Sequence, residues 1–138
     1  MHDTQPNKFD DWDWHDGPAA EANQPREHAF THIGLYLAWL IRHDMCDPRW
    51  FQRDRLEAVK AGTMTGSALA DDIDGQLLSL LMTSEGAAFT AACYPQYMTG
   101  YNDLLGDDAD YRLMESNELY ARVAPMIDRL YAGWTAAS

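Results

Sequence analysis

The chain has 138 residues and a formal net charge of −12, because 22 acidic residues stand against 10 basic ones. Hydrophobic residues make up 46%, enough for the core of one compact domain, and the length is too short for two ordinary domains. The charge argues against nucleic-acid binding and against binding to anionic membranes, since both need clusters of Lys and Arg. We therefore expect one acidic globular domain over residues 1–138.

Residues 1–27 are predicted to form an extended arm rather than a helix. They contain three prolines and little helical periodicity. They also contain Phe9, Trp12 and Trp14, and so many large aromatic side chains are unusual in a free tail. We expect the arm to pack on the rest of the chain, residues 28–138, which is predicted to form a helical core.

The strongest helical pattern runs from about residue 27 to about residue 44. Apolar residues such as Ile33, Leu37 and Leu40 recur three and four positions apart in this segment, which is the most apolar of the chain. The pattern predicts the central helix of the domain. Gly34 lies within it, and we expect this glycine to permit the close approach of another helix.

Three further helices are predicted between residues 47 and 82. Asp47 followed by Pro48 is typical of a helix start, and Gly62 is typical of a helix end. The next helix is a short one from about Ser67, and residues 75–82 are interpreted as the third.

Two helices are predicted in the C-terminal part. The first starts at Ser84 and continues to about residue 105, with Pro95 as an expected break or kink. The second starts at Ser116 or Asn117, contains Pro125 and ends at about residue 131. No segment alternates cleanly between apolar and polar residues, so strand signals are weak. The predicted fold class is mainly α.

The sequence also bears on location. No run reaches the roughly 18 apolar residues that a membrane-spanning helix needs, and the first residues do not resemble a signal peptide. Cys46 and Cys93 are far apart and do not have a metal-binding spacing. We expect free thiols, a cytoplasmic protein and no membrane partner.

Histidines provide the first candidate site. His28 and His32 are four residues apart, so on a helix they share one face, and His15 joins them if the arm folds back. An oxygen ligand would then come from one of the arm aspartates: Asp11, Asp13 or Asp16. Two imidazoles and a carboxylate form a recognised zinc or transition-metal set. However, Ala29 stands where a zinc protease has its glutamate, so these histidines are weak metal candidates and no cofactor is predicted.

The alternative role for the same residues is structural. A buried, hydrogen-bonded His32 would tie the arm to the central helix, together with Trp14, His15 and Trp39. Motifs of nucleophilic catalysis, phosphate binding and dinucleotide binding are missing from the sequence. We therefore expect a protein that is not an enzyme.

Acids and aromatic residues alternate in the arm, which predicts a surface for a protein partner. Tryptophan is favoured at interfaces, and surrounding acids steer a basic partner towards them. A second acidic segment lies at 106–110. The partner-binding candidates are Asp11, Trp12, Asp13, Asp16, Asp107, Asp108 and Asp110. In the alternative interpretation, the arm tryptophans only cover the core and the aspartates keep the arm soluble.

Two motifs stand out in the first half of the chain: Asp10-Asp11-x-x-Trp14-His15, and the run from Thr31 to Ile41, which contains His-Ile-Gly-x-x-x-Ala-Trp. A third follows in Glu85-Gly86-x-x-Phe89, Tyr94 and Tyr101. With these motifs, the sequence resembles a family of small acidic bacterial domains of unknown function over roughly residues 8–105.

Such domains are often encoded beside polymorphic toxins, so the resemblance implies an immunity protein whose partner is a cognate protein toxin. Because many antibacterial toxins are basic nucleases, an acidic chain suits such a partner. Two alternatives remain open: a small metal-binding protein or metal-dependent enzyme that uses His15, His28 and His32, and a homo-oligomeric module that buries Trp12 and Trp50.

Overall fold

The computed structural model describes residues 8–11, 31–73, 75–106 and 115–137. The fold is mainly α, as predicted. The helices are α2 (Thr31–Arg42), α3 (Arg53–Ala61), α4 (Gly66–Asp72), α5 (Ser84–Leu105) and α6 (Asn117–Ala137). Two strands, β1 (Lys8–Asp11) and β2 (Gln76–Leu78), and two 3₁₀ turns, η2 (Pro48–Trp50) and η3 (Ser79–Leu81), complete the described elements.

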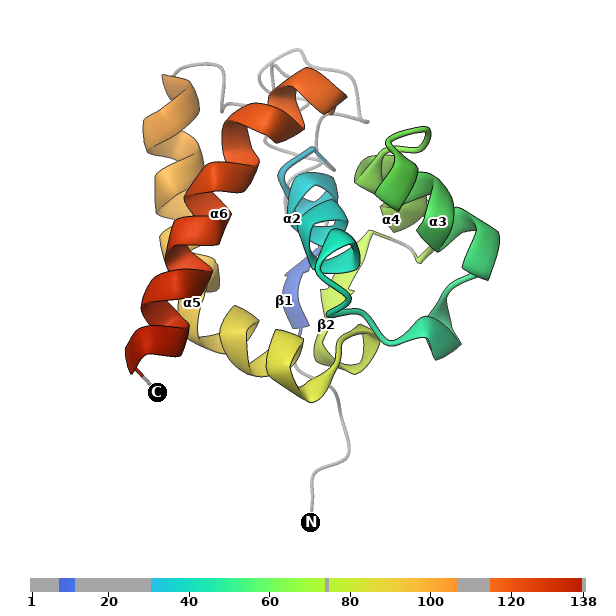
Figure 1. Cartoon of the computed structure of the whole chain (residues 1–138), viewed down its shortest axis with the longest axis horizontal. Helices are drawn as coiled ribbons and strands as arrows, with labels where there is room; N and C mark the ends of the chain where they lie inside the picture. Colours follow the sequence, from blue (N-terminus) through green and yellow to red (C-terminus); the bar gives the residue numbers. More distant parts are fainter. Residues whose placement is uncertain (1–7, 12–30, 74, 107–114, 138) are drawn as a thin grey trace.

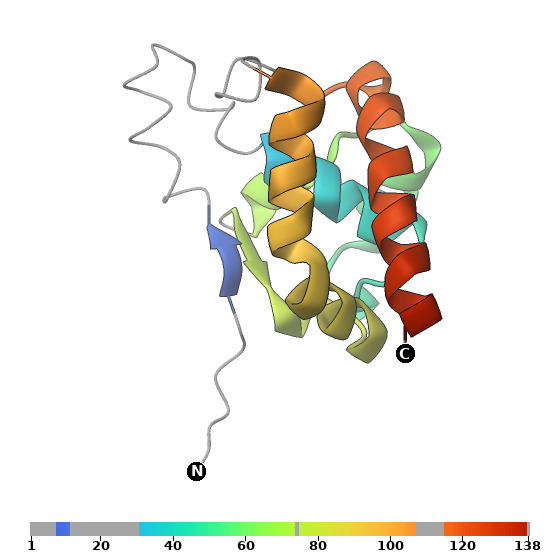
Figure 2. The same ribbon diagram turned by 90° about the vertical axis from the view of Figure 1, so that its left-hand side faces the viewer.

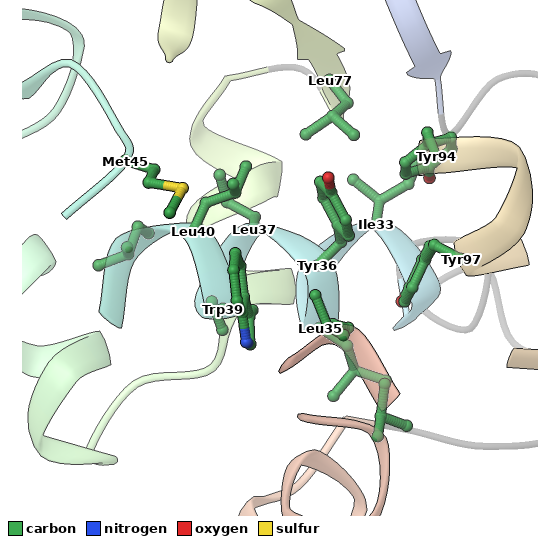
Figure 3. Close-up of a cluster of buried hydrophobic side chains, with 14 of the residues drawn as sticks. Ile33, Leu35, Tyr36, Leu37, Trp39, Leu40, Met45, Leu77, Tyr94 and Tyr97 are labelled. Carbon is green, nitrogen blue, oxygen red and sulfur yellow. The ribbon is translucent and has the colours of Figure 1, made fainter. Parts of the chain in front are cut away.

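Helix α2 is the centre of the domain, with α5 and α6 on one side and α3 and α4 on the other (Figure 1). Every residue of α2 before Arg42 is buried. A helix that is hydrophobic all round needs such complete cover. Figure 3 shows Leu77 of β2 and Tyr94 and Tyr97 of α5 against the side chains of α2. The predicted central helix is confirmed.

Helices α2 and α4 approach closely at two glycines, as expected for Gly34. A Cβ atom on Gly34 would collide with Ser67 and Glu115, and one on Gly66 would collide with the backbone of Gly34. Only glycine therefore fits at this crossing.

The two C-terminal helices start where they were predicted, and the second is longer than predicted. Thr83 caps α5 by accepting a hydrogen bond at its Oγ1 from the Gly86 backbone N–H, at 3.1 Å. The helix runs through Pro95, and its ribbon is bent rather than broken (Figures 1 and 2). Ser116 caps α6, which includes Pro125 and continues to residue 137 instead of ending near 131.

The segment after α2 is less regular than predicted. Asp47 accepts the Arg49 backbone N–H at 3.0 Å, but the turn it caps is the short η2, and α3 starts separately at Arg53. The chain is extended at Phe51, which separates the two elements. Gly62 ends α3 in the left-handed conformation, with a φ of 79°. This helix end is confirmed.

The helix predicted at residues 75–82 is wrong, because this segment forms β2 and η3. Strand β2 pairs antiparallel with β1, which places Asp10 opposite Leu77 and Asp11 opposite Gln76. The pairing partner lies more than sixty residues earlier in the chain, so local periodicity does not reveal it. Figure 2 shows the two strands side by side next to α5. Within the described ranges, no helix is both long and apolar enough to cross a membrane.

Candidate functional site

A buried polar cluster centred on Asp10 joins β1, α2 and α5. Only 3% of Asp10 is exposed. Its Oδ2 accepts a hydrogen bond from the Tyr94 hydroxyl at 2.5 Å and lies 2.8 Å from Nε2 of His32. Its Oδ1 accepts the Asp11 backbone N–H at 2.8 Å. We call Asp10, His32 and Tyr94 the Asp10 cluster.

The electrostatics of the Asp10 cluster favour a fixed set of donors. Burial, followed by the negative charge of Asp10, raises the pKa of Tyr94 well above its usual range, so its hydroxyl keeps its proton and donates. The His32 atom that faces this carboxylate is Nε2, and a hydrogen on Nε2 completes the contact. The Tyr97 hydroxyl also donates to the backbone carbonyl of His32 at 2.7 Å.

Tyrosine rings surround the Asp10 cluster. The Tyr36 ring meets Tyr94 edge-on, at 5.1 Å between centroids, and lies 4.8 Å from Tyr97. The ring of Tyr101 lies 6.1 Å from that of His32. In such a low-dielectric site each hydrogen bond is strong and each unpaired polar group is costly. The cluster therefore holds the arm strand against two helices.

A second buried carboxylate, Glu115, holds the start of α4. It accepts the backbone N–H groups of Gly66 at 2.8 Å and Ser67 at 2.7 Å, as well as the Ser67 hydroxyl at 2.7 Å. Burial raises the pKa of Glu115, and these hydrogen bonds act in the opposite direction. Its role is that of a helix cap supplied from a distant part of the sequence.

A contrasting, exposed region is formed by η2, α3 and the end of α4, and we call it the Trp50 face. Half of Trp50 is exposed, the largest exposed fraction among the large hydrophobic residues described. A cavity of about 310 Å³ lies beside it. Its lining residues are Trp50, Phe51, Gln52, Arg55, Leu69 and Ile73.

A larger cavity of about 600 Å³ lies between α3 and the end of α2. Ile41, Cys46 and Leu56 are among its lining residues. Ion pairs stand beside it, Lys60 with Asp44 at 2.5 Å and Arg53 with Glu57 at 3.8 Å. Burial raises the pKa of the Cys46 thiol to about 12. The thiol is therefore protonated at neutral pH and is a poor nucleophile.

Most of the predicted partner-binding, metal and arm-to-helix contact residues lie outside the described residues. These are Trp12, Asp13, Trp14, His15, Asp16, His28, Asp107, Asp108 and Asp110. In the ranges that the structure does describe, no three His, Cys, Asp or Glu side chains gather as a metal site would require.

The remaining predicted residues are found in the interior. Asp11, expected on an exposed binding surface, is instead buried, with 6% exposed. The reason is its place in β1, where its carboxylate accepts a hydrogen bond from Lys8 at 2.9 Å. His32 makes the arm-to-helix contact expected of it, through Asp10. Trp39 is buried too, but its Nε1 donates to Asp128 of α6 at 2.9 Å rather than to the arm.

Sequence reasoning missed the roles of Tyr94 and Glu115. Tyr94 and Asp10 are 84 residues apart, and Glu115 lies 49 residues from Gly66. The only available signal was the spacing of Tyr94, Tyr97 and Tyr101, which places several hydroxyl groups on one apolar helix face.

A domain of unknown function, DUF7832, matches residues 8–115, and the chain belongs to this family. The matched range begins with β1 and ends at Glu115, so it includes the whole Asp10 cluster and the Trp50 face. Helix α6 lies beyond it. No curated protein and no solved structure matches the chain.

Proposed function

We propose that this chain is an immunity protein that binds and neutralises a cognate, basic bacterial toxin. The observation that carries the proposal is the net charge of −12 on only 138 residues. Such a charge attracts a cationic partner over long distances and speeds the encounter of the two proteins.

The described surface supports this proposal because exposed carboxylates occur on several helices. They are found on α3, α5 and α6, at Asp54, Asp103, Glu118 and Asp128. Fixed acids spread in this way give a field over a large surface and do not depend on one loop. The acids at 13, 16, 107, 108 and 110 add to the same field, and we keep them as proposed contacts of the toxin.

The partner is first isolated by pull-down from the source organism, with washes at low and moderate salt, and identified by intact mass. We expect one stoichiometric basic protein whose binding weakens as salt rises, because screening shortens the reach of charge attraction. Recovery of the chain alone would contradict the proposal.

Charge reversal then tests the role of the acids with the purified pair. Changing Asp13, Asp16, Asp107, Asp108 and Asp110 to Lys should slow association and abolish protection of cells that express the toxin. The same five positions changed to Asn serve as the matched control and should give an intermediate loss. Full protection by the Lys variant, with its thermal unfolding unchanged, would overturn the proposal.

A further inference from the structure

The Trp50 face differs from the rest of the surface in its charge. Residues 47–55, which include η2 and the start of α3, contain two acids and three bases, although the chain as a whole has more than twice as many acids as bases. The three bases are Arg49, Arg53 and Arg55. The face thus combines both signs of charge with an exposed tryptophan.

The residue types of this face are those of an interface. Trp and Arg are the residues most enriched where a few side chains provide most of the binding energy. The cavity of about 310 Å³ beside Trp50 is at the lower end of the ~300–1,000 Å³ range of ligand pockets, so it suits one side chain better than a whole ligand.

We propose that the Trp50 face is the surface through which two copies of this chain form a dimer. The copies are related by a two-fold axis, so that Trp50 of each enters the cavity lined by Phe51, Leu69 and Ile73 of the other. A two-fold interface needs a self-complementary patch, and a face with both signs of charge can pair its bases with the acids of its copy. This proposal does not depend on the proposed function.

Charge complementarity favours a second copy over a basic partner at this face. A basic protein would meet Arg49, Arg53 and Arg55 here, whereas acids predominate elsewhere on the chain. Figure 1 shows α3 at one end of the long axis and α5 and α6 towards the other. A dimer formed through α3 therefore keeps α5 and α6 of the two copies apart, where salt screens their repulsion beyond a Debye length of about 10 Å at 0.1 M.

Sedimentation velocity of the full chain over a wide range of concentration tests the proposal. Trp50→Ala should raise the dimer Kd by about 30-fold or more, as expected for a central tryptophan. Leu104→Ala is the matched control, because Leu104 is the other large hydrophobic residue exposed in the described ranges, at 39%, and it lies on α5. This control should leave the Kd unchanged. Trp50→Phe retains a ring and should restore most of the affinity.

Salt provides a second, independent measurement. Raising salt from about 0.1 M to about 1 M screens both the repulsion between two copies of charge −12 and the charge pairs across their interface. It should therefore change the dimer Kd much less than the Kd of a complex with a basic toxin. A wild-type chain that stays monomeric at high salt and high concentration would overturn the proposal. A Trp50→Ala variant that dimerises as well as the wild type would also overturn it.

Discussion

The Asp10 cluster and the Trp50 face use the same kinds of residue in opposite ways. In the Asp10 cluster, Asp10 reaches partners 22 and 84 residues away, and all of them are buried. On the Trp50 face, Arg49 pairs with Asp47 and Arg53 with Glu57, only two and four residues apart, in the open. Long-range buried pairs determine how elements pack, whereas local exposed pairs contribute little to stability and remain available to a partner.

The comparison between the two regions predicts that the substitution with the largest effect on stability is at Asp10. Asp10→Ala removes the buried carboxylate that contacts both the Tyr94 hydroxyl and Nε2 of His32, so we expect a loss of about 3–5 kcal/mol in the free energy of unfolding. Denaturant unfolding measures this loss. A loss below about 1 kcal/mol would mean that the cluster does not hold the arm strand in place.

The second largest effect on stability is expected at Glu115, the other buried carboxylate that bonds to groups distant in the sequence. Glu115→Ala removes the acceptor of two backbone N–H groups and one hydroxyl at the start of α4, which should lower the free energy of unfolding by about 2–3 kcal/mol. Ser116→Ala, at the neighbouring helix cap, is the matched control, with a loss of about 1 kcal/mol. Equal losses in the two variants would contradict a special role for the buried carboxylate.

The pH dependence of stability provides a second test of the buried Glu115 carboxylate. Burial raises the pKa of Glu115 above its ordinary value of 4.5, so the folded chain holds this proton more tightly than the unfolded chain does. The contribution of Glu115 to stability should therefore fall as the pH rises from about 4.5 through the raised pKa. Unfolding curves of the wild type and Glu115→Gln over this range provide the measurement. If the stability of the wild type and of Glu115→Gln changed with pH in the same way, the raised pKa of Glu115 would be contradicted.

The smallest effect on stability is expected at the Trp50 face. Half of Trp50 is exposed and it belongs to a short turn, so Trp50→Ala should change the free energy of unfolding of the monomer by less than about 1 kcal/mol. The measurement is made at low protein concentration, where dimers do not contribute. A loss comparable to that of Asp10→Ala would place Trp50 in the core instead.

The difference between local and long-range contacts also explains which features could be predicted from the sequence. Helix α2, the end of α3 at Gly62 and the close approach at Gly34 were predictable, because apolar spacing and glycine conformation are local properties. Strand β2 was not, because its partner is the distant β1. Asp11 was misplaced for the same reason: an acid in an arm is usually exposed, and only the pairing of β1 with β2 buries it.

The central claim is that the buried Asp10 cluster determines stability, whereas the exposed Trp50 face determines dimer affinity. The most direct test compares Tyr94→Phe with Trp50→Ala, using both the free energy of unfolding and the dimer Kd. Tyr94→Phe removes one hydrogen bond from Asp10 and should lower stability by about 1–3 kcal/mol without changing the dimer Kd of the folded chain. Trp50→Ala should weaken the dimer while leaving the stability of the monomer almost unchanged. If each variant altered both properties in proportion, the buried cluster and the exposed face would not be separate, and the division would be wrong.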